Sequence, residues 1–242
     1  MMRLALLLPF VLIACVAKPP PIETITGQPI PEAEVKQTLL TLARTEWLAF
    51  GGQRLFVEDG VQVIKPVGLW EDDRGGSALV AKYWQILDPT SPLTGQDCDE
   101  PWSAAFISWL MIRAGVDSGQ FQRSNAHRDY IRKIVAHAHD VDFKLRPRRP
   151  ADYAPRPGDI VCRGRGRHRD LRDYTALPAD AELHCDLVVA TAAGRIEVIG
   201  GNVRQSVSWS DRVVDAQGRL GPPWFVVIEN RYRDPPAPVA FP

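Results

Sequence analysis

Three polar residues from separate stretches of the chain could together cleave an amide or ester bond. Ser103 follows Pro101 and Trp102 at the start of an expected helix, His184 begins an expected strand, and Asn202 ends the next strand. A serine hydroxyl attacks a carbonyl when a base removes its proton, and a third group holds that base in place. Backbone N–H groups in the first helical turn could stabilise the oxyanion. The sequence therefore predicts Ser103 as nucleophile, His184 as base and Asn202 as the orienting residue.

The spacing of the two expected strands supports the pairing of His184 with Asn202. A three-residue loop, 192–194, is expected between them, and its glycine suits the left-handed position of such a turn. Counting back along antiparallel strands, His184 faces Asn202 on a surface that is expected to cover the helix of Ser103. A two-residue loop would shift the pairing and separate the two side chains. Asp186 shares this surface and is the alternative orienting residue, and a salt bridge to a nearby arginine is its purely structural interpretation.

Several of these residues also have structural interpretations. A serine such as Ser103 is typical of the residue that begins a helix. Glycine and asparagine, as in residues 200–202, are common in turns. Trp102, His127 and Gly201 are candidate substrate contacts beside the predicted site, although a histidine such as His127 is also typical of a solvated helix.

Four motifs in this order carry a resemblance to a known superfamily. They are PWSAAFISW at 101–109, PGDIV at 157–161, HCDLVV at 184–189 and VIGGN at 198–202. Over about residues 97–210 the chain resembles the CHAP and NlpC-type amidase and peptidase superfamily, whose fold is papain-like. The segment is also similar to an uncharacterised group of bacterial lipoproteins that carry serine in the Pro-Trp-Ser form.

The resemblance implies hydrolysis of an amide bond, with peptidoglycan as the preferred substrate. In the superfamily a cysteine occupies the position of Ser103, a strand histidine is the base, and a polar residue of the next strand orients it. A thiol beside a histidine ionises readily, whereas a hydroxyl needs concerted proton removal. The serine therefore leaves three function classes open: a serine-variant amidase or peptidase, a serine esterase, and a non-catalytic module that binds peptidoglycan or a peptide.

The cysteines divide by position in the chain. Cys162 and Cys185 flank a long loop and are expected to form a disulfide, which leaves Cys98 unpaired. Cys98 precedes the helix of Ser103 by a few residues and is a rival nucleophile. A zinc site from Cys162, Cys185 and nearby histidines is less favoured, because the sequence has no Cys-x-x-Cys spacing. We expect no metal and no other cofactor.

The N-terminus has the pattern of an exported lipoprotein. Arg3 precedes an apolar stretch that is too short to span a bilayer comfortably. The four residues that end at Cys15 resemble the lipobox, in which the cysteine is lipidated, and a plain secretory signal is the alternative. Residues 1–14 are then a signal peptide and 15–33 a proline-rich tether. The resemblance implies an acyl anchor that holds the protein at the periplasmic face of the outer membrane.

Residues 34–242 are expected to form a single α+β domain of papain-like fold. Apolar periodicity predicts helices over 31–50, 77–87 and 125–138, and a further helix that has Asp99 as its cap and ends at Gly115. Alternating patterns predict strands over 158–162, 184–191, 195–202, 207–214 and 224–232. The helical part, 34–140, would pack on an antiparallel sheet of about five strands in 155–235.

The charge balance gives no support for nucleic acid as a partner. The chain has 29 basic and 29 acidic residues, so its formal net charge is zero. The loop between Cys162 and His184 nevertheless contains five arginines near its start. Such a loop is either simply solvated or faces an anionic polymer of the cell envelope, such as peptidoglycan. The expected partners are therefore this polymer and, through the anchor, the membrane.

Overall fold

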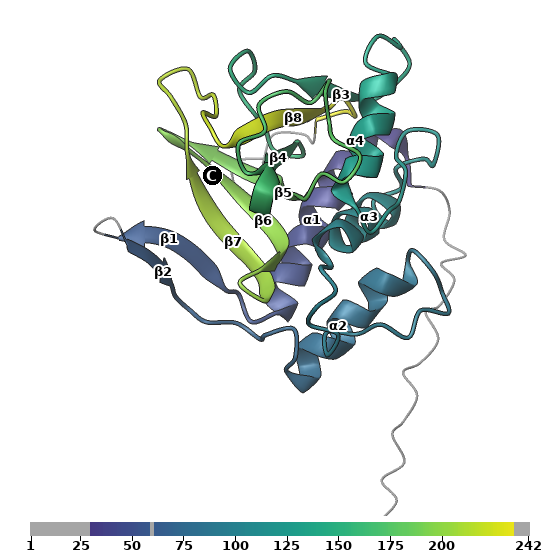
Figure 1. Cartoon of the computed structure of the whole chain (residues 1–242), viewed down its shortest axis with the longest axis vertical. Helices are drawn as coiled ribbons and strands as arrows, with labels where there is room; N and C mark the ends of the chain where they lie inside the picture. The colour runs from purple at the N-terminus through teal and green to yellow at the C-terminus, as the bar shows by residue number, and fades with distance from the viewer. Residues whose placement is uncertain (1–29, 59–60, 235–242) are drawn as a thin grey trace, which may run out of the picture.

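The computed structural model describes residues 30–58 and 61–234 (Figure 1). The expected signal peptide, Cys15 and most of the expected tether lie outside these residues. The described part begins with a short 3-10 helix, Glu32–Glu34, which leads into the first α-helix. Within the described residues, no helix has the length and apolar character needed to cross a membrane.

In the described part of the chain, eight strands form one mixed sheet. Their bounds are β1 Arg54–Glu58, β2 Val61–Ile64, β3 Leu145–Arg148, β4 Ile160–Gly164, β5 Leu183–Ala192, β6 Arg195–Val203, β7 Ser206–Val213 and β8 Trp224–Asn230. The order across the sheet is β2-β1-β7-β6-β5-β4-β8-β3. Only β1 and β7 pair in parallel, and the other neighbours are antiparallel. The α+β class is confirmed, whereas the expectation of about five strands was too low.

The three additional strands are short and lie toward the two edges of the sheet. β1 and β2 form a hairpin within the part of the chain that was expected to be helical, and the hairpin projects from the body of the molecule (Figure 1). β3 contains Pro147, which removes a backbone donor and is tolerated in edge strands. Because these strands are short and partly exposed, their sequences lack the strong alternation that revealed the other five.

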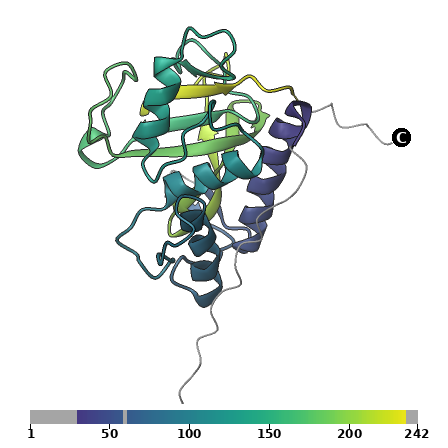
Figure 2. The ribbon, with the colours of Figure 1, turned by 90° about the vertical axis from the view of Figure 1, so that its right-hand side faces the viewer.

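The helices cover one face of the sheet (Figure 2). They are α1 Val35–Ala49, α2 Arg74–Gln85, α3 Ser103–Arg113 and α4 His127–Ala136, and each lies where the sequence predicted a helix. The expected start of α3 was wrong: Trp102, not Asp99, is the N-cap, and no side chain caps the first turn. Gly115 follows the end of α3 with a φ of 84°, which only glycine adopts without strain.

Helix α3 lies at the centre of the helical layer. Nine of its residues, from Ser103 to Met111, are buried, because it packs against β5, β6 and the helices α1 and α2. Gly201 of β6 allows this close approach: a Cβ atom there would lie 2.5 Å from Cγ of Phe106. A helix that is apolar on all sides is typical of such a central position.

The sheet is buried on both faces. Cys185, Leu187 and Val189 of β5 belong to the core beneath the helices. Val188 belongs to a second cluster on the opposite face, which also contains Val198 of β6. His184 and Asp186 share the face of Val188, because successive strand residues alternate. The expectation that this surface covers the helix of Ser103 was therefore wrong.

The register between β5 and β6 follows from two compensating features. The turn has two residues, 193–194, rather than the expected three, so Ala192 lies opposite Arg195. A bulge between Val188 and Ala190 adds one residue on β5 and restores the expected pairing of Val188 with Val198. The predicted pairing of Val188 with Val198 is thus correct, although the predicted turn was not. The pairing of β5 with β6 ends at Leu187 and Ile199, so it does not extend to His184 and Asn202.

The contact between α3 and β6 gives a test of the fold. The Gly201→Ala variant is expected to lower the free energy of unfolding by about 1–3 kcal/mol, because the new methyl group collides with Phe106. Gly221→Ala is the matched control, since a Cβ there has no heavy atom within 4 Å. Denaturant unfolding measures both variants, and equal small effects would contradict the close approach.

Candidate active site

A cavity of about 620 Å³ opens where the first residues of α3 and α4 meet the β6–β7 turn and the loop after β4. Ser103, His127 and Asn202 are among the residues that line it. Ser103 is 3 % exposed and His127 is 4 % exposed, so their polar atoms meet the cavity but little bulk solvent. The cavity size is in the usual range for small-molecule and peptide pockets.

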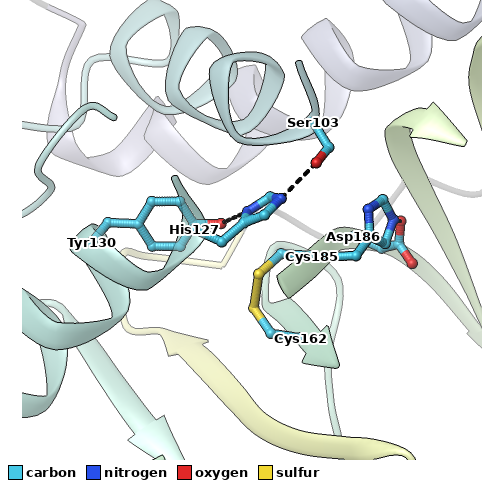
Figure 3. Close-up of a disulfide and its surroundings, with 7 residues drawn as sticks. Ser103, His127, Tyr130, Cys162, Cys185 and Asp186 are labelled. Atoms are coloured by element: carbon cyan, nitrogen blue, oxygen red, sulfur yellow. Dashed lines mark hydrogen bonds and ion pairs between the residues drawn. A yellow bond between two sulfur atoms is a disulfide. The ribbon is translucent and has the colours of Figure 1, made fainter. Parts of the chain in front are cut away.

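Ser103 contacts His127 directly. Its Oγ lies 2.7 Å from Nε2 of His127, and Nδ1 of the same ring lies 2.5 Å from the hydroxyl oxygen of Tyr130 (Figure 3). His127 and Tyr130 are three residues apart on α4, so they lie on the same face of that helix. Tyr130 is fully buried. The three side chains therefore form one continuous hydrogen-bonded chain that begins at the cavity.

Two proton arrangements satisfy both hydrogen bonds of His127. In one, Ser103 donates to Nε2, and the protonated Nδ1 donates to Tyr130. In the other, Tyr130 donates to Nδ1, and the protonated Nε2 donates to Ser103. Only the first arrangement leaves Nε2 free to accept the serine proton, so the tautomer of His127 decides whether Ser103 can be activated.

His184 is bound elsewhere. Its Nε2 lies 2.8 Å from Oδ1 of Asp186, and both side chains are almost completely buried. The second oxygen of Asp186 lies 3.6 Å from a terminal nitrogen of Arg212. Among the described residues, His184 makes no hydrogen bond to Ser103 or to Asn202. Asp186, the alternative orienting residue, is therefore the group that holds His184.

The ring of His184 nevertheless lies close to the ring of His127, at 6.0 Å between centroids. Burial lowers the pKa of His127 well below its usual value, and the electrostatic influence of His184 and Arg165 adds to this effect, while Asp186 opposes it. The imidazole of His127 is consequently neutral at neutral pH and able to accept a proton.

Asp186 supplies the buried negative charge. Burial alone would raise the pKa of its carboxyl group, but His184, Arg212 and Arg163 outweigh burial and hold the pKa well below its usual range. Burial and the charge of Asp186 raise the pKa of Tyr130, which stays a neutral phenol. Gly200 makes room for the carboxylate, since a Cβ there would lie 1.9 Å from Oδ1 of Asp186.

The first turn of α3 offers donors for an oxyanion. The first hydrogen bond of the helix runs from the N–H of Phe106 to the carbonyl of Trp102, at 2.9 Å. The N–H groups of residues 103–105 therefore have no partner within the helix, and no side chain caps them. The positive end of the helix dipole adds to their attraction for negative charge.

The end of β6 and the turn that follows it have an unusual backbone. Asn202 of β6 and Arg204 and Gln205 of the turn all have positive φ values, between 53° and 61°. Three such non-glycine residues within four positions are costly, and strain of this kind clusters at functional sites. Asn202 and Gln205 line the cavity, and the carbonyl of Gln205 accepts a hydrogen bond of 2.6 Å from the N–H of Glu71. Asn202 is thus at the cavity, although it does not hold His184.

Two of the expected substrate contacts are packing residues instead. Trp102 is 1 % exposed, and its indole nitrogen donates to Glu71 at 2.5 Å. Gly201 is buried against Phe106. The third, His127, does line the cavity. Its contact with Ser103 was not predicted from the sequence, and the spacing of His127 and Tyr130 on one helix face is the signal that points to it.

The cysteines follow the prediction. Cys162 and Cys185 form a disulfide between β4 and β5 (Figure 3), and Cys98 is a free, exposed thiol. Cys98 lines the cavity, and the small burial that it has, together with the charges of Glu71, Asp72 and Asp99, raises its pKa. A raised pKa disfavours the thiolate, which makes Cys98 a weak rival to Ser103. The described residues contain no cluster of potential metal ligands.

Comparison with known proteins identifies a family. DUF2272, described as an uncharacterised protein family conserved in bacteria, matches residues 72–234. This match spans more than half of the chain, so the chain belongs to the DUF2272 family. No curated protein and no solved structure matches it. The matched region contains α2, α3, α4 and every residue of the site described above except Glu71.

The hydrogen bond between His127 and Tyr130 can be tested through stability. The Tyr130→Phe variant is expected to lower the free energy of unfolding by about 1–3 kcal/mol, because it leaves Nδ1 of a buried imidazole without a partner. Tyr174→Phe is the control, and its effect is expected to stay within about 0.5 kcal/mol. Thermal and denaturant unfolding provide the measurement. Equal effects of the two substitutions would show that the buried hydrogen bond is absent.

Proposed function

We propose that this protein is a serine hydrolase of an amide or ester bond, with Ser103 as nucleophile and His127 as general base. The observation that carries the proposal is the 2.7 Å hydrogen bond between Ser103 Oγ and His127 Nε2 at the cavity. The sequence predicted His184 as the base. We assign this role to His127 instead, because His184 is bound to Asp186 and makes no hydrogen bond to Ser103 among the described residues.

The proposed reaction has two stages. Ser103 Oγ attacks the substrate carbonyl while its proton passes to Nε2 of His127, and the N–H groups at the start of α3 stabilise the oxyanion. The tetrahedral intermediate collapses when His127 gives this proton to the leaving amine or alcohol. Water then attacks the acyl-serine while His127 takes one of its protons, and His127 returns this proton to Oγ of Ser103 as the carboxylic acid product leaves. The charge of Asp186 stabilises the transient imidazolium, since it is the group that raises the pKa of His127.

An amide bond in peptidoglycan is the preferred substrate. This choice rests on the resemblance of the motifs around Ser103, His184 and Asn202 to the CHAP and NlpC-type superfamily. A helix that begins at the nucleophile and packs on the antiparallel strands β5 and β6 is consistent with a papain-like relationship. The expected lipidation of Cys15 would place the enzyme at the periplasmic face of the outer membrane, where this substrate is within reach.

A non-catalytic binding module is the second candidate, and Tyr130 is the observation that favours it. The partner of Nδ1 in Ser-His hydrolases is usually a carboxylate, which stabilises the protonated base. Here it is a neutral phenol. If Tyr130 donates to His127, the cavity retains its shape but Ser103 is not activated.

A fluorophosphonate probe tests the hydrolytic function. Labelling of the intact protein is expected, because Ser103 Oγ displaces fluoride from phosphorus while its proton passes to His127. Ser103→Ala should abolish labelling, and His127→Gln should slow it by about 100-fold or more. His184→Gln is the matched control, since it removes the other imidazole. Mass spectrometry locates the adduct and gives the rates.

The outcomes of this labelling separate the alternatives. If His184→Gln lowered the labelling rate more than His127→Gln did, the role of general base would belong to His184. Absence of labelling, together with retained binding of muropeptides, would overturn the hydrolase in favour of the binding module.

The pH dependence of labelling gives an independent test. Because the active form has a neutral His127, the labelling rate is expected to fall only when the pH drops through the lowered pKa of His127. The rate should therefore persist below pH of about 6.5, where an ordinary histidine becomes protonated. A midpoint at or above this pH would contradict the assignment of buried His127 as the base.

A further inference from the structure

We propose that Arg165, with Arg128 beside it, forms a carboxylate-binding subsite next to Ser103. The substrate then carries a carboxylate group close to the bond that is cleaved. This inference rests on the proposed hydrolytic function and specifies the substrate class of the same site. Both arginines line the cavity that contains Ser103 and His127.

Arg165 differs from the other arginines of its loop. Arg167 pairs with Asp180 at 2.6 Å and with Glu182 at 3.7 Å. Arg169 and Arg172 both pair with Asp170. Among the described residues, the side chain of Arg165 has no ion pair and no hydrogen bond. The five donors of its guanidinium group are therefore available at the cavity.

The backbone holds Arg165 in place. Its N–H donates to the carbonyl of Glu182 at 2.8 Å, and its own carbonyl accepts from the N–H of His168 at 2.8 Å. Gly166 follows with a φ of 51°, and a Cβ there would lie 2.3 Å from a carboxylate oxygen of Glu182. The side chain of Arg165 therefore starts from a fixed point at the edge of the cavity, although the loop beyond it is exposed.

Arg128 contributes a second guanidinium group. It follows His127 directly and makes only weak contacts, at 3.5 Å to the carbonyl of Ala181 and 3.9 Å to Asp129. The charge of Arg165 reaches the reacting groups, since it lowers the pKa of His127. A carboxylate is the anion that suits this arrangement, because it is compact, planar and able to accept two parallel N–H donors from one arginine.

The other charges of the cavity limit where such an anion can lie. Glu71, Asp99 and Glu182 also line the cavity. Glu71 and Asp99 lie near the start of α3, and the carboxylate of Glu182, beside Arg165, is 3.7 Å from Arg167, which offsets its charge. A long polyanion would meet Glu71 and Asp99, whereas a single carboxylate at the arginines would not. The subsite is therefore expected to select one carboxylate group rather than a polyanionic chain.

Two matched probes test this subsite. They are diphenyl phosphonates on one peptide scaffold, which carry either a glutamate or a glutamine side chain beside the phosphorus. In each case Ser103 Oγ forms a bond to phosphorus, phenoxide leaves, and the serine proton passes to His127. The intact protein is expected to react about ten-fold faster with the glutamate probe. Arg165→Gln should reduce the ratio of the two labelling rates to about one. Arg167→Gln is the control: Arg167 already forms ion pairs with Asp180 and Glu182, so this variant should keep the preference for the glutamate probe.

A binding measurement separates failure of the subsite from failure of the hydrolytic function. Isothermal titration calorimetry compares N-acetylglutamate with N-acetylglutamine on the Ser103→Ala protein and on its Arg165→Gln derivative. Selective binding of N-acetylglutamate that depends on Arg165, without labelling by either probe, would retain the subsite and overturn the hydrolase. Equal labelling by both probes without selective binding would overturn the subsite alone. If Arg165→Gln slowed labelling by the glutamate and glutamine probes by the same factor, the subsite would also be overturned. Arg165 would then affect the reaction only through its influence on His127.

Discussion

The hydrogen bond between Ser103 and His127 is the interaction on which the site depends, and two different helices must meet to form it. Ser103 is fixed by α3, which is buried along nearly its whole length and cannot shift without disturbing the core. His127 is fixed by α4 and by its second hydrogen bond to Tyr130. Because both partners are buried, the imidazole is neutral and its remaining freedom is the choice of tautomer.

Two adjacent glycines of β6 leave room for different side chains on the two faces of the sheet. Gly201 admits Phe106 of α3 on the helical face, and Gly200 admits the carboxylate of Asp186. Asp186 and His184 form a buried hydrogen-bonded pair that influences the pKa of His127, although neither side chain makes a hydrogen bond to Ser103 among the described residues. A Gly-Gly-Asn sequence that is typical of a turn thus serves mainly to permit close packing.

The sequence predicted the helices, five of the eight strands, the disulfide and the position of Ser103 at a helix start. It did not predict the partner of Ser103, for a physical reason. Apolar alternation along β5 shows that the strand is buried, but a sheet with two buried faces does not reveal which face the helices cover. His184 was placed on the helical side, and His127 was treated as peripheral because a single helix histidine carries little signal without its neighbour Tyr130. The short strands β1, β2 and β3 were missed because edge strands tolerate proline and exposed residues.

The protonation state of His127 tests the central claim most directly. Nitrogen-15 NMR of the labelled imidazoles distinguishes a ring protonated at Nδ1 from one protonated at Nε2. The Ser103→Ala variant removes the hydrogen bond between Ser103 and Nε2 of His127, and the signals that change identify His127. If His127 is the base, its ring is expected to be neutral at pH 7, with the proton on Nδ1 and an unprotonated Nε2 whose signal shifts when Ser103 is replaced. A ring that carries its proton on Nε2, or one whose Nε2 does not respond to the loss of Ser103, would contradict this role of His127.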